Sequence, residues 1–268
     1  MSSRSIYLMH SIKSFLKYLF NSCGYDVRKR THPGLDSVWD IKQIYAGRQL
    51  KTIFDLGAHV GETACSYAEN FQCASIHSFE PHPQTFCLLQ ANVRRFPNVN
   101  TLNVAVGEKE GTVALHVNQF SATNSLLPNV NELKEGAVAA AMRPVGKVTI
   151  SLCSLDSYCR DQNVSFIDLL KMDVQGYELH VLRGARRLLA EGRIALIYSE
   201  VQFEALYEGQ AYFQDVYAEL MRHGFQLVDL YGHNRSLYSA LRWCDALFVN
   251  PSAMKAGSEQ NTGQPPPR

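Results

Sequence analysis

A carboxylate and two glycines follow the first apolar run that favours β-structure, and together they could hold a small ligand. The run continues as DLGAHVG, in which Asp55 precedes Gly57 and Gly61. In a doubly wound sheet, the turn after the first strand is a ligand-binding position. Dinucleotides are held there by G-x-G-x-x-G, whereas this turn is D-x-G-x-x-x-G. A carboxylate in that place would repel a pyrophosphate and favour a ligand that carries positive charge.

S-adenosylmethionine has the charges that such a turn would favour: an ammonium, a sulfonium, a single carboxylate and no phosphate. The two glycines would let the backbone approach its amino-acid portion. Asp55 would then pair with the ammonium, directly or through water. The alternative is a structural role for Asp55, as the cap of the helix that follows a tight turn.

A second acid, Glu80, ends the next apolar run in SFEPHP, immediately before Pro81 and 25 residues after Asp55. An acid at the end of the second strand accepts hydrogen bonds from the hydroxyls of a ribose. Nicotinamide dinucleotides also use such an acid, so an NAD-dependent oxidoreductase is an alternative function. Asp55 and the missing G-x-G argue against it. The plainer interpretation of Glu80 is a solvated loop acid.

A third acid, Asp173, follows the apolar run LLKM, at the carboxyl end of a strand expected beside the first one. Methyl transfer to a hydroxyl needs an oriented acceptor and a base that takes the proton. We predict that Asp173 orients the acceptor or acts as this base. Alternation along a strand places Lys171 on the same face, so a structural ion pair between the two is the competing interpretation.

The elements that must position these acids alternate between strand and helix. This order predicts a parallel sheet with helices on both faces. Strands are expected at residues 52–56, 75–79, 99–106, 166–172, 194–201, 225–230 and 246–249, and helices at 35–47, 62–70, 83–95, 178–190 and 211–223. A turn and strand-like run at 107–118 and a long excursion at 119–147 interrupt the alternation. An excursion of that length is either functional, such as a lid, or disordered.

Composition excludes several classes of protein. A formal net charge of +1 gives no field that would gather nucleic acid, so we expect no nucleic-acid partner. The seven cysteines include no CxxC pair, which suits neither a disulfide framework nor a zinc site. They are typical of reduced thiols in a cytoplasmic protein.

Three segments are expected along the chain. Residues 1–34 form an entry segment with an amphipathic helix at 6–20, which would dock on its own domain or, less favourably, touch a membrane surface. Its lysines and the lack of a small-residue cleavage site argue against a signal peptide or a spanning helix. Residues 35–250 form one domain, and the polar tail at 251–268 should be disordered. The oligomeric state is not indicated.

Five segments together resemble the FkbM-type methyltransferases, which are S-adenosylmethionine-dependent enzymes with a Rossmann-like fold. The segments span roughly residues 50–205 and are DLGAHVGETA, SFEPHP, NVAVGEKEG, SLDSYC and IDLLKMDVQGYELHVLRGARRLL. The resemblance implies an α/β class I methyltransferase fold, with a mostly parallel seven-stranded sheet and helices on both faces. It also implies O-methylation of a hydroxyl on a carbohydrate or natural-product acceptor.

The resemblance also implies roles for single residues. Transferred by position, the methionine end of the cofactor is lined by Asp55, Gly57, Ala58, His59 and Gly61. Glu80, with Pro81 beside it, binds the ribose, and the stretch from Asn103 to Ala105 binds the adenine. The segment TNSLL in the long excursion would close over the cofactor through Asn124 or Ser125, unless it is an ordinary loop.

Two positions depart from the family pattern. His59 replaces the common asparagine, and Gln175 replaces a glutamate. An amide takes no proton at neutral pH and is a poor ligand for a hard cation, so we predict no dedicated metal site. The same departure leaves open a third function, a cofactor-binding protein without turnover.

Overall fold

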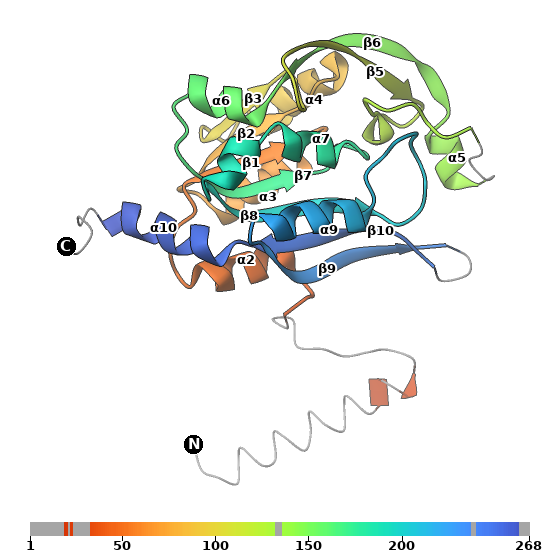
Figure 1. Cartoon of the computed structure of the whole chain (residues 1–268). Coiled ribbons are helices and arrows are strands. Elements are labelled where there is room, and N and C mark those ends of the chain that lie inside the picture. Colours follow the sequence, from red (N-terminus) through yellow and green to blue (C-terminus); the bar gives the residue numbers. More distant parts are fainter. Residues whose placement is uncertain (1–18, 21, 24–32, 132–135, 237–239, 263–268) are drawn as a thin grey trace.

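The computed structural model of the chain describes residues 19–20, 22–23, 33–131, 136–236 and 240–262 (Figure 1). The amphipathic helix predicted over residues 6–20 therefore lies almost entirely outside the described residues. Among the helices that are described, none is long and apolar enough to cross a bilayer.

A seven-stranded sheet in the order β3-β2-β1-β7-β8-β10-β9 forms the centre of the fold. Six strands run in the same direction, and β10 runs antiparallel to both of its neighbours, β8 and β9. The order reverses between β1 and β7, which is where an open α/β sheet binds its ligand. The strands are β1 (Thr52–Leu56), β2 (Ser75–Phe79), β3 (Val99–Leu102), β7 (Ile167–Met172), β8 (Ile194–Gln202), β9 (Gln226–Arg235) and β10 (Leu241–Val249). The predicted class I methyltransferase fold is confirmed.

Helices cover both faces of this sheet (Figure 1). Adjacent residues of β1 point to opposite sides, so Ile53 packs under the helices of one face and Phe54 under those of the other. One core is closed by α2 (Ser37–Tyr45) and α3 (Glu62–Asn70), beside which lies α4 (Pro83–Val93). The other is closed by α6 (Leu155–Asp161), α7 (Glu178–Arg183), α8 (Arg186–Ala190) and α9 (Phe213–Arg222).

Two expected elements are divided in the structure. The strand expected at 99–106 separates into β3 and β4 (Ala105–Val106), because β4 leaves the main sheet. It joins a second sheet of order β4-β6-β5 with β5 (Gly111–Asn118) and β6 (Pro144–Cys153). The helix expected at 178–190 divides into α7 and α8 at Gly184, where the chain packs so closely that a Cβ would lie 1.9 Å from the Gly107 carbonyl oxygen.

The long excursion at 119–147 carries structure of its own. It contains the 3₁₀ turn η1 (Ser121–Thr123) and the short helix α5 (Ala137–Ala141). The Phe120 amide donates to the Ala141 carbonyl at 2.9 Å, which ties the two ends of the segment together. The excursion thus presents η1 to the carboxyl ends of the central strands.

The prediction of a disordered tail from residue 251 is wrong for its first part, because α10 (Pro251–Thr262) follows β10 directly. The Asn250 side chain accepts hydrogen bonds from the amides of Ser252 and Ala253, both at 3.1 Å, and so caps the helix. Ala253 is buried, and Met254 packs against the core under α2 and α3. A cap and two apolar contacts are enough to start a helix in a polar segment.

Candidate active site

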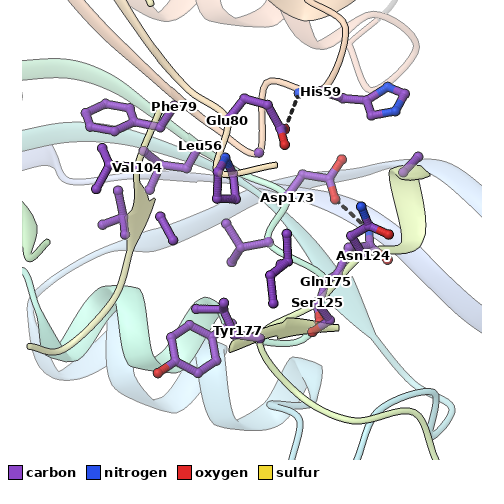
Figure 2. A pocket seen from close by; sticks show the side chains of 18 of the residues that line it. Leu56, His59, Phe79, Glu80, Val104, Asn124, Ser125, Asp173, Gln175 and Tyr177 are labelled. Carbon is purple, nitrogen blue, oxygen red and sulfur yellow. Dashed lines mark hydrogen bonds between the residues drawn. The ribbon is translucent and has the colours of Figure 1, made fainter. Parts of the chain in front are cut away.

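A cavity opens at the carboxyl ends of β1, β2 and β7, at the point where the strand order reverses. Figure 2 shows apolar side chains such as Phe79 and Val104 on one side, and polar ones such as Asp173 and Asn124 on the other. This division suits a ligand with an apolar ring at one end and polar groups at the other. The lining also includes Leu56, Gly57, His59, Glu80, Pro81, Ala105, Val106, Leu115, Ser121, Ala122, Ser125, Leu126, Val174, Gln175 and Tyr177.

Gly57 lines the cavity and is held between two strands. Its amide and that of Ala58 both donate to the Phe79 carbonyl, at 3.0 and 2.9 Å. Gly57 has φ of +71°, and a Cβ there would lie 1.9 Å from the Asp173 carbonyl oxygen. Only glycine fits such a backbone conformation at so close an approach. Its contact with the methionine end of the cofactor stays a prediction.

Ala58 and Gly61 are not brought to the cavity. Ala58 is buried in a small core between α3 and α4. Gly61 begins α3 with φ of +94°, and a Cβ on it would lie 2.8 Å from Leu89 Cδ1 of α4. In this structure both residues allow close helix packing behind the turn.

Asp55 is fully buried and does not line the cavity. Its partner is Lys171, the residue opposite it on β7, whose Nζ lies 3.1 Å from Asp55 Oδ1. The same ammonium donates to the carbonyls of Leu56 and Gly57, at 3.3 and 3.1 Å. The structure therefore gives no direct contact between Asp55 and a ligand ammonium: the carboxylate pairs with a buried cation that holds the turn.

The charge on Lys171 is kept by its neighbours. Burial lowers the pKa of this ammonium, but the carboxylates of Asp55 and Asp173 outweigh burial, and the pKa is raised overall. Nζ lies 3.9 Å from Asp173 Oδ2, compared with 3.1 Å from Asp55 Oδ1. The ion pair expected between Lys171 and Asp173 is thus the weaker of the two contacts, because the neighbour across the strands is closer than the neighbour along the strand.

Glu80 lies in the cavity wall, almost buried, with both carboxylate oxygens oriented by the backbone. Oε1 accepts from the His82 amide and Oε2 from the His59 amide, each at 2.9 Å. Burial raises the pKa of Glu80 to about 7, although these two hydrogen bonds act to lower it. Each oxygen keeps a lone pair for a ligand hydroxyl, as the predicted ribose contact requires.

Of four further candidate residues, three line the cavity, and one holds a loop that forms its wall. His59, at φ of +49°, places Nε2 2.8 Å from Ser121 Oγ of η1, and burial lowers its pKa. Pro81 and Ala105 line the cavity. Asn103 does not: its Nδ2 donates to the carbonyls of Glu80 and Pro81, at 2.9 and 3.0 Å, and so holds the loop after β2.

Ser125 lines the cavity and is itself buried. Its Oγ donates to the Gln175 carbonyl at 2.7 Å and accepts from the Leu127 amide at 3.1 Å. The excursion is thereby tied to the loop that follows β7. The structure assigns Ser125 to this join and brings Asn124 to the same wall.

Asp173 lines the cavity with its side chain 38% exposed, so a ligand can reach it. Gln175 Nε2 donates to Asp173 Oδ1 at 2.7 Å and to Glu200 Oε2 at 2.9 Å, while Gln175 Oε1 accepts from Tyr207 at 2.6 Å. A glutamate at position 175 would bring a third carboxylate between two others. The amide instead bridges them, which gives a physical reason for the departure from the family pattern.

Sequence reasoning missed Glu200 and Tyr207 as members of this group. Glu200 lies near the carboxyl end of β8, after the apolar run IALIYS, which is the signal that identified Glu80 and Asp173. Burial, together with the charges of Asp173 and Glu178, raises the pKa of Glu200 well above its usual range. Tyr207 lies in a loop and gave no comparable signal.

The residues that line the cavity fit S-adenosylmethionine. The apolar wall suits an adenine ring, the oriented carboxylate of Glu80 suits a ribose, and the open backbone at Gly57 suits the amino-acid portion. Within the described ranges, no group of three or more His, Cys, Asp or Glu side chains is arranged to hold a metal ion. The expectation of no dedicated metal site stays a prediction.

Comparison with known proteins identifies a family model that matches the chain and several relatives of similar sequence. The model of the methyltransferase FkbM domain matches residues 55–227. The chain is 27% identical over 165 residues to 2-O-methyltransferase NoeI of Sinorhizobium fredii, covering 59% of this chain and 66% of that protein. It is 25% identical over 146 residues to hexuronic acid methyltransferase AglP of Haloferax volcanii, covering 54% of each. The match thus spans about half to two thirds of these relatives.

A solved structure is also similar in outline. Fibrillarin of Aeropyrum pernix, with natively bound S-adenosyl-L-methionine, superposes with a TM-score of 0.42 at 16% identity, covering 75% of this chain and 67% of that one. Because this similarity is low, the fold is assigned from the strand order of the chain itself.

Proposed function

The chain belongs to the FkbM methyltransferase family, and from this premise we propose that it is an S-adenosylmethionine-dependent O-methyltransferase. Its acceptor is the hydroxyl of a carbohydrate or a related natural product. The names of its relatives, a 2-O-methyltransferase and a hexuronic acid methyltransferase, support the carbohydrate class. The free thiols of its cysteines support a reducing, cytoplasmic compartment.

The observation that carries the proposal is the orientation of Glu80. A buried carboxylate held by two backbone amides at the end of β2 is arranged to accept two hydroxyl hydrogen bonds. The acids that line the cavity are Glu80 and Asp173. Asp55 lies behind the lining, and Lys171 neutralises its charge. A ribose-binding acid such as Glu80 is compatible with a nicotinamide dinucleotide. The charge of Asp173, the residue against which Gly57 packs, would repel a pyrophosphate there and so disfavours that ligand.

S-adenosylmethionine, when bound, supplies an activated methyl group on its sulfonium. Phe79 and Val104 would contact the adenine ring, Glu80 would bind the ribose, and the backbone at Gly57 would lie against the amino-acid portion. Asp173 accepts the proton of the acceptor hydroxyl at Oδ2, because Gln175 already donates to Oδ1. The apolar wall, with Phe79 and Val104, lies on the side of the cavity opposite Asp173.

Glu80→Gln tests the ribose contact. We expect the dissociation constant for S-adenosylhomocysteine to rise about 10- to 100-fold, because charge-assisted hydrogen bonds are lost. The new amide also places a donor against the backbone amide of His59 or His82. Because the ionised form of Glu80 is the better acceptor, wild-type affinity should increase as pH rises through about 7, and this increase should be smaller in the variant. Calorimetric titration between pH 6 and pH 8 measures both effects.

Glu69→Gln is the matched control, since Glu69 lies on the surface in an ion pair with Arg95. It should leave both the affinity and its pH dependence unchanged. A Glu80→Gln protein that binds S-adenosylhomocysteine as tightly as the wild type would remove Glu80 from the site. Binding without formation of S-adenosylhomocysteine from S-adenosylmethionine, across a panel of hydroxylated glycans, would favour a cofactor-binding protein without turnover.

A further inference from the structure

Asn124 carries an amide group of which only one half has a partner. Its Oδ1 accepts from the Asn118 amide at 2.8 Å, and this bond sets which way the side-chain amide is turned. Its Nδ2 is shielded from solvent and has no acceptor among the described residues. A buried donor without a partner destabilises the protein, because it has lost its hydrogen bonds to water. An acceptor that the protein itself does not provide would remove this cost.

The unpaired group belongs to the wall of the cavity. Asn124 lines the cavity just after η1, and Figure 2 shows it on the same side as Asp173 and Gln175. Of the buried side-chain atoms without a hydrogen bond in the described part of the chain, Asn124 Nδ2 is the one whose residue lines this cavity. The unpaired donor therefore belongs to a residue that lines the cavity in which a ligand would bind.

Most other polar side chains of the lining are already paired or can only accept. The hydroxyl of Tyr177 points away from the other lining side chains in Figure 2. His59 Nε2 and Ser121 Oγ are 2.8 Å apart and share one hydrogen bond, and both residues keep contact with solvent. The Gln175 amide protons are directed to Asp173 and Glu200. Glu80 and Asp173 are acceptors when ionised. Asn124 Nδ2 is thus the side-chain donor of the lining that is shielded from solvent and lacks an acceptor among the described residues, and a ligand carboxylate would supply that acceptor.

We propose that Asn124 Nδ2 donates a hydrogen bond to the carboxylate of the amino-acid portion of the cofactor. The inference rests on the proposed function, since it takes the cofactor to be S-adenosylmethionine. The carboxylate is the one group of that molecule that needs donors and is repelled by the acids of the cavity. Asn124 therefore selects a cofactor that has this carboxylate over one that lacks it.

The test compares two ligands on variants of the full chain by calorimetric titration. S-adenosylhomocysteine has the carboxylate, while S-adenosyl-3-thiopropylamine keeps the ammonium and lacks it. Asn124→Asp retains an Oδ1 acceptor for the Asn118 amide and replaces Nδ2 by an oxygen. It should weaken S-adenosylhomocysteine about 10- to 100-fold and leave the amine analogue almost unchanged. Asn124→Ala, which adds no charge, should show the same selectivity with a smaller loss.

Gln119→Glu adds a negative charge to the same segment at an exposed position outside the lining, and it should affect neither ligand. Two results would overturn the assignment of Asn124: wild-type affinity for S-adenosylhomocysteine in both variants, or equal losses for both ligands. Equal losses would indicate a general role in shaping the cavity or a contact to another part of the ligand. A wild-type protein that binds neither compound would instead overturn the proposed function.

Discussion

Asp173→Asn is expected to reduce turnover by about 10²- to 10⁴-fold, the usual contribution of a positioned base, while cofactor affinity stays nearly unchanged. Asparagine has almost the same shape and keeps an Oδ1 that can accept from Gln175, so the geometry of the wall should persist. What it cannot do is take a proton at the position of Oδ2. The measurement is the rate of S-adenosylhomocysteine formation with a glycan that the wild type methylates, beside a calorimetric titration of S-adenosylhomocysteine.

The loss should appear in kcat rather than in the KM for the cofactor. Asp161→Asn is a suitable control, because Asp161 is a surface residue paired with Arg160. Wild-type kcat in Asp173→Asn would exclude Asp173 as the base. Equal losses in rate and cofactor affinity would make it a binding residue, and Glu200 would then be the next acid to substitute.

Gly57→Ala is expected to destabilise the protein by about 3 kcal/mol or more and to abolish detectable cofactor binding. The alanine would have to adopt φ of +71° with its Cβ 1.9 Å from the Asp173 carbonyl oxygen. The β1 turn and the loop after β7 would have to separate, which moves Gly57 and Asp173 together. Chemical denaturation and titration with S-adenosylhomocysteine measure the two effects.

Gly224→Ala separates backbone strain from crowding. Gly224 has φ of +78°, close to that of Gly57, but nothing lies within 4 Å of the position that a Cβ would take. It should cost about 1–2 kcal/mol of stability and leave cofactor affinity unchanged. If both variants lost the same stability and both bound the cofactor, the close approach of Gly57 to Asp173 would have no part in shaping the site.

Most of the sheet could be predicted because its inner strands are buried on both sides. All residues of β7 are buried, and β1 and β2 have the bounds expected from their apolar runs. The strands toward the β9 edge of the sheet were harder to predict. In the first half of β10, Arg242 and Asp245 interrupt the apolar residues and burial is mostly partial, so no continuous apolar run indicated it. It forms by antiparallel pairing with the end of β8. The separation of β4 from β3 likewise depends on a partner, β6, that is distant in sequence.

The site was predictable to the level of strand ends and not of contacts. Glu80 and Asp173 end apolar strands, and both reach the cavity as expected. Asp55 also ends a strand, but the pairing register places Lys171 beside it, and register cannot be obtained from local sequence. Selection against a pyrophosphate therefore rests on Asp173, because Glu80 would bind the ribose of either ligand. Asp55 holds the lysine that binds the turn.

The bridging role of Gln175 was hidden for a related reason. Its two acid partners come from different parts of the chain, and its backbone has φ of +55°, which a glutamine seldom adopts. The amide is explained by what surrounds it in space: between Asp173 and Glu200 it donates, where a glutamate would repel.

Titration of the purified wild-type chain with S-adenosylhomocysteine and, separately, with NADH tests the central claim most directly. The cavity at the ends of β1, β2 and β7 should bind S-adenosylhomocysteine at one site per chain, with no measurable heat from NADH. Saturable binding of NADH at one site, together with no binding of S-adenosylhomocysteine, would contradict the account.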